Sequence, residues 1–380
     1  MRVFVRTPRT LRPKRRSALS VAVVLALALA PAGPGFADQR SAQSVKAAGV
    51  TFNFAQVLDW IGVGVFAVGR WDGTISVFRV PGPNEFGPMI LQAMSTSSGR
   101  GIEMLAAADD QSFFTSDGPN RLALWRRKSV GSPLELAASP SYDMAAGVAN
   151  SGLALNANGT DYFASGHEGG RVLIWRREAD GNYQLANTVD VRSPNTPSNP
   201  WMLRNVRGLG AWRGDRLISG SEDGDLVAIS VPDGRELFRH RYNAAAQRGI
   251  NALSIVGETL AVANCAVGQA DKNIWLFDLA NDRPSLVDAE NLALDTGRAQ
   301  IFNFDVDLIS VPGKAGAPPT LTFFSSTEEG LIWEGRIEDG QLTVTGVTRV
   351  SPEGGAVMAV APKGDLVAAA AHAIRLFKTD

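Results

Sequence analysis

The segment YFASGHEGGRVLIW (residues 162–175) consists of two apolar runs joined by a short polar stretch. Large apolar and β-branched residues fill both runs, which is typical of strands buried on both faces. The glycines between the runs tolerate positive φ angles and favour a tight connection. The segment therefore predicts a β-hairpin, and it raises the question of whether His167 in the turn has a chemical role.

The same pattern recurs along the chain. Three further copies are well preserved: VFAVGRWDGTISVF (65–78), SFFTSDGPNRLALW (112–125) and RLISGSEDGDLVAI (216–229). Three copies are degenerate: LAVANCAVGQADKNIWLF (260–277), LTFFSSTEEGLIWEG (321–335) and LVAAAAHAIRLF (366–377). Successive copies are 42 to 58 residues apart. This spacing is typical of repeat architectures in which each period is one structural unit.

Each period contains further turn signals, such as WRGD, VPDG, IEDG and PKGD, and helical periodicity is not sustained in this region. One period therefore holds about four short strands. Four-stranded units at this spacing predict an all-β fold, a seven-bladed β-propeller of antiparallel sheets over residues 50–380.

Two stretches resemble WD repeats: ALNANGTDYFASGHEGGRVLIWRR (154–177) and RLISGSEDGDLVAISVPDGREL (216–237). No copy ends in the Trp-Asp pair that gives that family its name. The resemblance implies a propeller that presents a rigid rim of loops to other proteins, because WD-repeat proteins are mostly interaction platforms.

The N-terminus has the pattern of an export signal. Seven basic residues precede an apolar run from Ala18 to Ala30, and small residues stand at Gly35 and Ala37. We expect a signal peptide over residues 1–37 and a linker over residues 38–49. The run is shorter than the roughly 20 residues of a membrane span, although a retained anchor is the alternative. Arg15 and Arg16 resemble a twin-arginine signal, so a periplasmic protein exported by either route is predicted.

Cleavage after Ala37 would leave 30 basic and 38 acidic residues, a net charge of −8. An acidic body argues against binding to a nucleic-acid backbone. Cys265 is the one cysteine and lies in an apolar run, so we expect a buried, inert thiol and no internal disulfide.

Arginines recur just before the expected innermost strands, at Arg100, Arg207, Arg248 and Arg298. Acidic residues recur in or near the hairpin turns, at Asp72, Asp117, Glu168, Asp223, Asp271 and Glu329. In WD repeats a histidine at the first place bonds an aspartate at the second, so the resemblance implies that arginine takes the histidine's role here. The expected pairs are Arg100–Asp117, Arg207–Asp223, Arg248–Asp271 and Arg298–Glu329. The alternative is an arginine-lined channel mouth that binds an anionic ligand.

The segment VRSPNTPSNPWMLRN (191–205) contains three prolines and is expected to be a surface loop. It ends in large apolar residues beside an arginine, a composition typical of an interaction hot spot. The candidate interaction residues are Trp201, Met202, Leu203 and Arg204. The alternative is that Trp201 folds back over the channel mouth.

No catalytic motif, metal-binding motif or cofactor-binding motif is evident. His167 has no histidine counterpart in the other copies, and zinc needs three or four ligands, so a structural turn residue is the prediction. The chain has three histidines and no Cys-x-x-Cys-His, which excludes a multi-histidine copper cluster and attached haem. A lactonase-like, calcium-dependent hydrolase needs only carboxylates and amides. The residues that would serve are Glu103, Asn150, Asn251, Asn303 and Asp305.

The sequence therefore favours a non-catalytic scaffold with a protein partner in the cell envelope and without a cofactor, a metal or, after cleavage, a membrane span. The metal-dependent hydrolase and the binder of a small anion are the alternatives.

Overall fold

The computed structural model describes residues 42–45, 55–80, 90–96, 99–127, 133–194, 204–243, 249–266, 271–292, 301–312, 319–350, 355–361, 366–370 and 373–377. The predicted signal peptide and most of the predicted linker lie outside these residues. Over the described ranges the chain is built of β-strands, and its one helix is a single 3₁₀ turn, η1 (Met144–Ala146). None of the described segments is a helix long and apolar enough to cross a bilayer.

The strands form antiparallel sheets. The first is β2 (Ala55–Gly62), β3 (Val65–Arg70), β4 (Thr74–Arg79) and β5 (Ile90–Thr96). The second is β6 (Met104–Asp109), β7 (Ser112–Ser116), β8 (Leu122–Arg126) and β9 (Glu135–Ala138). The third is β10 (Ala149–Ala157), β11 (Thr160–His167), β12 (Arg171–Arg177) and β13 (Tyr183–Asp190). The fourth is β14 (Val206–Trp212), β15 (Arg216–Ser221), β16 (Asp225–Ser230) and β17 (Glu236–Arg241).

The strands after β17 are not all divided into separate four-stranded sheets. One sheet has eight strands, β18 (Ile250–Val256), β19 (Thr259–Ala266), β20 (Ile274–Asp278), β21 (Ser285–Glu290), β22 (Ile301–Val311), β23 (Thr320–Thr327), β24 (Leu331–Glu338) and β25 (Gln341–Arg349). Its halves are joined where Cys265 and Ala266 of β19 pair with Phe302 and Ile301 of β22. The last sheet is β26 (Ala356–Val360), β27 (Leu366–Ala370), β28 (Ala373–Phe377) and β1 (Ala42–Val45).

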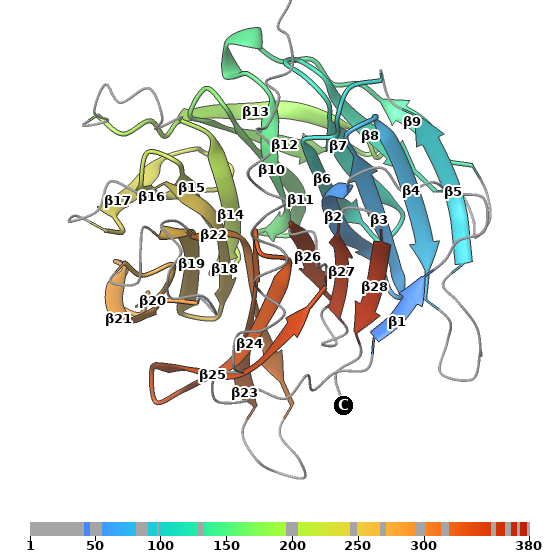
Figure 1. Ribbon diagram of the computed structural model, residues 1–380. Coiled ribbons are helices and arrows are strands. Elements are labelled where there is room, and N and C mark those ends of the chain that lie inside the picture. The colour runs from blue at the N-terminus through green and yellow to red at the C-terminus, as the bar shows by residue number, and fades with distance from the viewer. Residues whose placement is uncertain are drawn as a thin grey trace, which may run out of the picture. The chain divides into compact units, whose positions relative to one another are not determined.

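The fold is thus an all-β propeller of four-stranded antiparallel units (Figure 1). In the described residues the hydrogen-bonded sheets number six, one fewer than predicted, because two units share the β19–β22 pairing. The innermost strands β2, β6, β10, β14, β18, β22 and β26 contact one another in this order, and β26 contacts β2. The circle is closed by strand β1 pairing with β28 and by Trp60, whose Nε1 donates to the Ala359 carbonyl at 3.1 Å.

The predicted hairpins are confirmed. All six residues of β3 are buried, and so are the last six residues of β11, because both faces of the middle strands pack against neighbouring sheets. The turns after β3, β11, β15 and β23 each close with a glycine N–H bonded to the carbonyl three residues earlier. These glycines have φ between 69° and 89°, at Gly73, Gly170, Gly224 and Gly330, a region that glycine adopts without strain.

The core lies between neighbouring sheets. Phe114 of β7 and Phe163 of β11 have ring centroids 4.3 Å apart, and the Phe114 ring meets Tyr183 edge-on at 5.1 Å. A Cβ atom at Gly152 would lie 2.6 Å from that of Ala106, so a glycine on the inner strand β10 allows the two sheets to approach.

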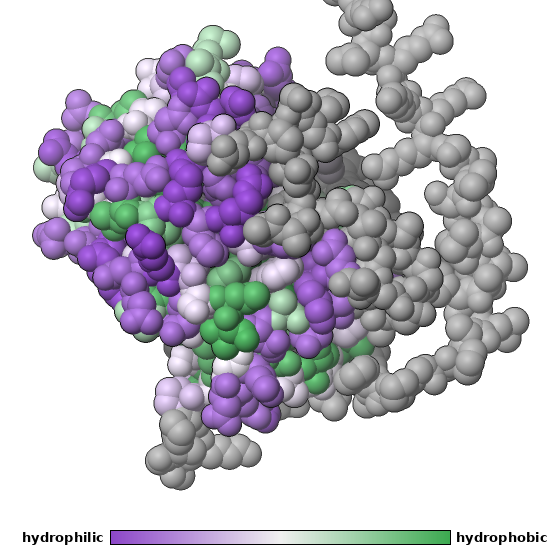
Figure 2. Space-filling model, turned by 90° about the vertical axis from the view of Figure 1, so that its left-hand side faces the viewer, coloured by the Kyte–Doolittle hydropathy of each residue, from purple (hydrophilic) through white to green (hydrophobic). Residues whose placement is uncertain are grey.

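The outer strands are more exposed, and the side shown in Figure 2 is mainly hydrophilic with small apolar areas. Strand β21 on this side exposes Leu286 and Val287.

Candidate binding site at the channel mouth

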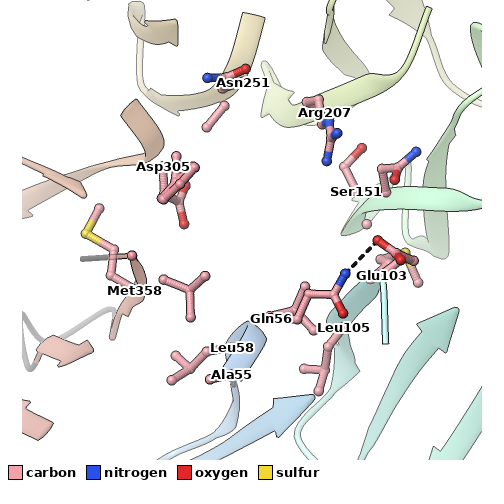
Figure 3. A pocket seen from close by; sticks show the side chains of 18 of the residues that line it. Ala55, Gln56, Leu58, Glu103, Leu105, Ser151, Arg207, Asn251, Asp305 and Met358 are labelled. Carbon is pink, nitrogen blue, oxygen red and sulfur yellow. Dashed lines mark hydrogen bonds between the residues drawn. The ribbon is translucent and has the colours of Figure 1, made fainter. Parts of the chain in front are cut away.

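A cavity of about 420 Å³ lies at the start of the innermost strands, in the middle of the ring (Figure 3). Residues on or next to all of these strands line it, and Trp71 joins them from the turn after β3. The residues used below are Gln56, Trp71, Glu103, Asn150, Ser151, Arg207, Asn251, Phe304, Asp305 and Met358. Its size falls within the roughly 300–1,000 Å³ of small-molecule sites.

Five inner strands carry the same irregularity near their first residues. The register of β2, β10, β14, β18 and β22 with the following strand shifts by one residue, which leaves one residue of each inner strand unpaired. These residues are Gln56, Asn150, Arg207, Asn251 and Phe304, and all of them line the cavity. A β-bulge redirects a side chain out of the regular alternation, so the bulges supply much of the cavity wall.

The polar lining residues are held by hydrogen bonds. Gln56 Nε2 donates to Glu103 Oε2 at 2.7 Å, which links β2 to the entrance of β6. Asn251 Nδ2 donates to the Asn303 carbonyl at 2.6 Å, and Ser151 Oγ donates to the Val206 carbonyl at 2.8 Å. The last two bonds each cross from one inner strand to the next. They therefore hold the cavity wall in place and also hold neighbouring sheets of the propeller together.

Arg207 is the one of the four predicted channel-mouth arginines that the described cavity lining includes. Its Nε donates to Glu222 Oε1 at 2.7 Å and not to Asp223, so the predicted Arg207–Asp223 pair is wrong. Asp223 is buried and instead accepts from the Ser193 N–H at 2.8 Å and from the Ser221 hydroxyl. The physical reason is that a buried carboxylate is satisfied by nearby backbone and hydroxyl donors, while Arg207 stays at the exposed rim.

The Arg100–Asp117 pair stays a prediction, and Arg100 Nη1 lies 3.3 Å from the place that a Cβ atom at Gly118 would occupy. Asp117 is 3.8 Å from Arg121, in the same turn, and Arg100 is exposed and precedes β6 without lining the cavity. The other two predicted pairs involve Arg248 and Arg298, which lie outside the described residues.

The turn acids support the backbone locally. Asp72 Oδ1 accepts from the Thr74 N–H at 2.9 Å, and Glu168 Oε2 accepts from the Val148 N–H at 3.2 Å. Asp271 Oδ1 accepts from the Lys272 N–H at 3.2 Å, and the side chain of Glu329 is buried. Asp72, Asp223 and Glu329 occupy the third position of their turns, whereas Glu168 occupies the second, as the turn hydrogen bonds show.

Three carboxyl groups lie on inner strands, Asp59 on β2 and Asp305 and Asp307 on β22, and Asp305 lines the cavity. Burial raises the pKa of Asp59 to about 6 and that of Asp307 to about 7. Burial, and then the charges of Asp307 and Asp59, raise the pKa of Asp305 well above its usual range. Asp59 Oδ2 accepts from the Ala107 N–H at 3.0 Å and Asp307 Oδ2 from the Val360 N–H at 3.1 Å, so both tie their strand to the next one.

His167 is fully buried and belongs to the blade interior, not to the cavity. Its Nε2 lies 2.8 Å from Ser165 Oγ and its Nδ1 lies 3.3 Å from the Gly147 carbonyl. Burial lowers the pKa of His167 to about 4, so the ring is neutral at pH 7. These contacts agree with the predicted structural role.

Sequence reasoning placed Glu103, Asn150, Asn251 and Asp305 on inner strands, and all four line the cavity. Asn303 does not; it is buried and its Nδ2 donates to the Asn273 carbonyl at 2.9 Å. Sequence reasoning missed Gln56, Trp71, Ser151 and Phe304. Gln56 lies one residue into its inner strand, as Asn150, Arg207 and Asn251 do, whereas Phe304 lies three residues into β22, and the amino-acid pattern gave no signal for either position.

Other predicted features are less fully described. Trp201, Met202 and Leu203 lie outside the described residues, and Arg204 is exposed at the edge of that segment. The side chain of Cys265 is likewise outside the described part. Within the described ranges, no three side chains among histidine, cysteine, aspartate and glutamate are grouped as a metal site would require.

The sequence matches no protein-family model, and no curated protein matches it. Among solved structures, a chain in the crystal structure of a mitotic checkpoint complex is similar, with a TM-score of 0.61 and 16% identity. The match covers 92% of this chain and 98% of the other chain. At this identity the similarity supports the propeller fold alone.

Proposed function

We propose that the protein is a non-catalytic scaffold that binds a protein partner at the mouth of its central channel. The observation that carries the proposal is the exposure of two large aromatic side chains beside the cavity, since Trp71 is 56% and Phe304 is 42% exposed. Tryptophan and arginine are enriched among the residues that dominate binding energy at interfaces, and Arg207 lines the same cavity as Trp71.

The propeller is proposed to have seven blades. The eight-stranded sheet is counted as two blades, because β18–β21 and β22–β25 each repeat the pairing order of the other sheets. The β19–β22 pairing spans two residue pairs at the end of β19. Seven radial units would give a rim on which several loops face one partner.

The scaffold is proposed to act in the periplasm of the cell envelope. The basic N-terminus, the apolar run from Ala18 to Ala30 and the small residues near Ala37 support export and cleavage. Mass spectrometry of the mature N-terminus from an envelope fraction tests this part, and an intact Met1 terminus would contradict it.

The experiment that tests the scaffold is affinity capture of the tagged full-length protein from the envelope fraction, followed by mass spectrometry. Trp71→Ala is expected to lose the captured partner, because it removes an exposed aromatic anchor without opening a core cavity. Trp201→Ala tests the second predicted contact segment in the same way. Leu136→Ala, on the outer strand β9, is the control, since Leu136 is equally exposed but remote from the cavity lining.

A metal-dependent hydrolase is the second candidate, favoured by the position of Glu103, Asn150, Asn251 and Asp305 in one cavity. This candidate expects tight Ca²⁺ binding that Asp305→Ala abolishes, measured by calorimetry. The third candidate, a binder of small anions, is weaker, because Arg207 is neutralised by Glu222.

A further inference from the structure

The hydrogen-bond groups of the cavity are only partly used within the protein. The neutral donors Gln56, Asn150, Ser151 and Asn251 each donate to a protein acceptor. Acceptors remain: within the described residues, Glu103 accepts one bond at Oε2, and Asp305 accepts one from the Val306 N–H at Oδ1. The second oxygen of each carboxylate is therefore available to a donor in the cavity.

The charges point the same way. Arg207, the one described cation in the lining, is paired with Glu222 at 2.7 Å, so it does not offset the negative charge that Glu103 brings to the lining. Burial and the charges of Asp307 and Asp59 raise the pKa of Asp305, and a cation beside Asp305 would favour its ionised form. A positively charged group in the cavity would reduce the repulsion among these carboxylates.

The apolar part of the lining suits an organic cation better than a metal ion. Trp71 and Phe304 expose aromatic surface beside the carboxylates, and aromatic faces attract guanidinium and ammonium groups. Leu58, Leu105 and Met358 line the remainder and would pack against the methylene groups of a long side chain. A cavity of about 420 Å³ has room for such a side chain with part of its backbone.

We propose that the channel cavity binds a basic side chain, an arginine or lysine on an extended segment of the partner, with Glu103 and Asp305 as its counter-charges. The bulged residues Gln56 and Asn150 shape the wall, and Trp71 and Phe304 cover the side chain at the rim. This inference rests on the proposed scaffold function and names the chemistry of the partner segment.

Three probes test the inference on the full-length protein by isothermal titration calorimetry. They are the peptide acetyl-Gly-Ser-Arg-Gly-Ser-amide, the same peptide with citrulline in place of arginine, and L-arginine amide. Citrulline keeps the shape of arginine and removes its charge. The arginine peptide is expected to bind at least tenfold more tightly than the citrulline peptide and than L-arginine amide. Equal affinities for the two peptides, or no binding of the arginine peptide, would overturn the proposal, and equal affinity for L-arginine amide would overturn its assignment to a partner segment.

Two variants locate the site. Glu103→Gln and Asp305→Asn are each expected to weaken binding of the arginine peptide at least tenfold and to leave the citrulline peptide unaffected. Asp161→Asn is the matched control, because Asp161 is an exposed carboxylate that is paired with Arg177 and does not line the cavity. Equal loss for Asp161→Asn, or no loss for both cavity variants, would overturn the assignment.

The result also separates this inference from the scaffold function. If Glu103→Gln and Asp305→Asn capture the envelope partner as well as the unmodified protein does, the cation site is wrong and the scaffold stands. If no partner is captured and the arginine peptide still binds through Glu103 and Asp305, the scaffold is wrong and the cation site stands.

Discussion

His167 and Trp175 are joined through a single hydroxyl group, that of Ser165. Trp175 Nε1 donates to Ser165 Oγ at 2.9 Å, and Ser165 Oγ lies 2.8 Å from His167 Nε2. Because the Gly147 carbonyl can only accept, Nδ1 of the neutral ring carries the hydrogen and donates to it, and Nε2 accepts from the Ser165 hydroxyl. This chain of hydrogen bonds connects β11, β12 and the segment before β10. The neutral histidine gives each ring nitrogen one partner in it.

Replacing His167 should therefore destabilise the fold. His167→Ala removes a fully buried ring and leaves the Ser165 hydroxyl and the Gly147 carbonyl without this partner. We expect the free energy of unfolding to fall by about 2–4 kcal/mol in urea denaturation. Gln184→Ala, exposed on the outer strand of the same sheet, should change it by less than about 0.5 kcal/mol. Similar effects for the two variants would contradict the proposed role.

The same histidine should give a defined pH dependence. Its pKa is about 4 in the folded protein, against an ordinary value of 6.5, so between these values the unfolded chain binds a proton that the folded chain does not. The contribution of neutral His167 to stability is full above pH 6.5 and is lost as the pH falls toward 4. The stability difference between the unmodified protein and His167→Gln should therefore shrink from pH 7 to pH 4.5. A constant difference over this range would show that His167 does not titrate as described.

Asp307 should act in the opposite direction. Its pKa is raised by burial to about 7, so the folded protein holds a proton that the unfolded chain has released, and stability from this group is lost as the pH rises from about 4 through 7. Asp307→Asn removes the charge but keeps an oxygen for the Val360 N–H. We expect the variant to be more stable than the unmodified protein at pH 8, by about 1 kcal/mol or more, and equally stable near pH 4.

The control for Asp307→Asn is Asp161→Asn, since Asp161 is exposed and its ion pair is weak. Burial also raises the pKa of Asp59, to about 6, and the charge of Asp59 raises that of Asp307, so Asp59→Asn should reproduce part of the effect. No gain at pH 8 for either variant would contradict the raised pKa values that burial gives to these two carboxyl groups.

Local patterns in the sequence predicted the hairpins, their glycine turns and the propeller, because alternating apolar runs and turn residues determine these features over short distances. The junction of two units was not predictable, because it depends on pairing of Cys265 with Phe302 between separate copies. Gly335 stands where most other hairpin copies end in a large apolar residue. A side chain does not fit there, because a Cβ atom would lie 2.2 Å from the Phe323 ring.

The site was less predictable than the fold. The spacing of arginines and acids suggested ion pairs such as Arg207–Asp223. The Asp223 side chain is buried, however, and Arg207 at the exposed rim donates to Glu222 instead. The bulges that direct Gln56 and Phe304 into the cavity leave no mark in the amino-acid pattern, since a one-residue shift in register changes which face a side chain occupies.

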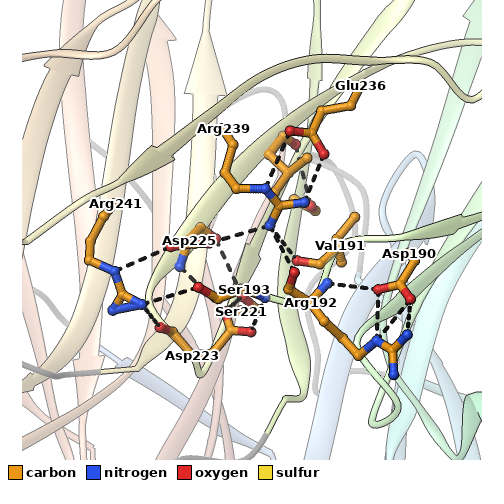
Figure 4. Close-up of polar contacts among 12 residues, drawn as sticks. Asp190, Val191, Arg192, Ser193, Ser221, Asp223, Asp225, Glu236, Arg239 and Arg241 are labelled. Carbon is orange, nitrogen blue, oxygen red and sulfur yellow. Dashed lines mark hydrogen bonds and ion pairs between the residues drawn. The ribbon is translucent and has the colours of Figure 1, made fainter. Parts of the chain in front are cut away.

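A buried carboxylate in the fourth sheet holds an arginine that reaches the third sheet. Asp225 on β16 lies 3.3 Å from Arg239 Nη1 and 3.3 Å from Arg241 Nε, both on β17 (Figure 4). Arg239 Nη1 also donates to the Val191 carbonyl at 2.8 Å, just after β13, and so reaches the neighbouring sheet.

Asp225→Ala should test this joint. Removing the carboxylate leaves two partly buried arginines without their shared counter-charge, a change that costs about 3–5 kcal/mol in fully buried pairs. Here the loss should be nearer 2 kcal/mol, because Arg239 keeps Glu236 at 2.7 Å and Arg241 keeps the Asp223 carbonyl at 2.9 Å. Asp190→Ala, which removes the exposed partner of Arg192, should cost less than about 1 kcal/mol in the same urea titration. If Asp225→Ala were no more harmful than Asp190→Ala, the carboxylate would not hold the two sheets together, and the contacts of Arg239 with the backbone would be sufficient.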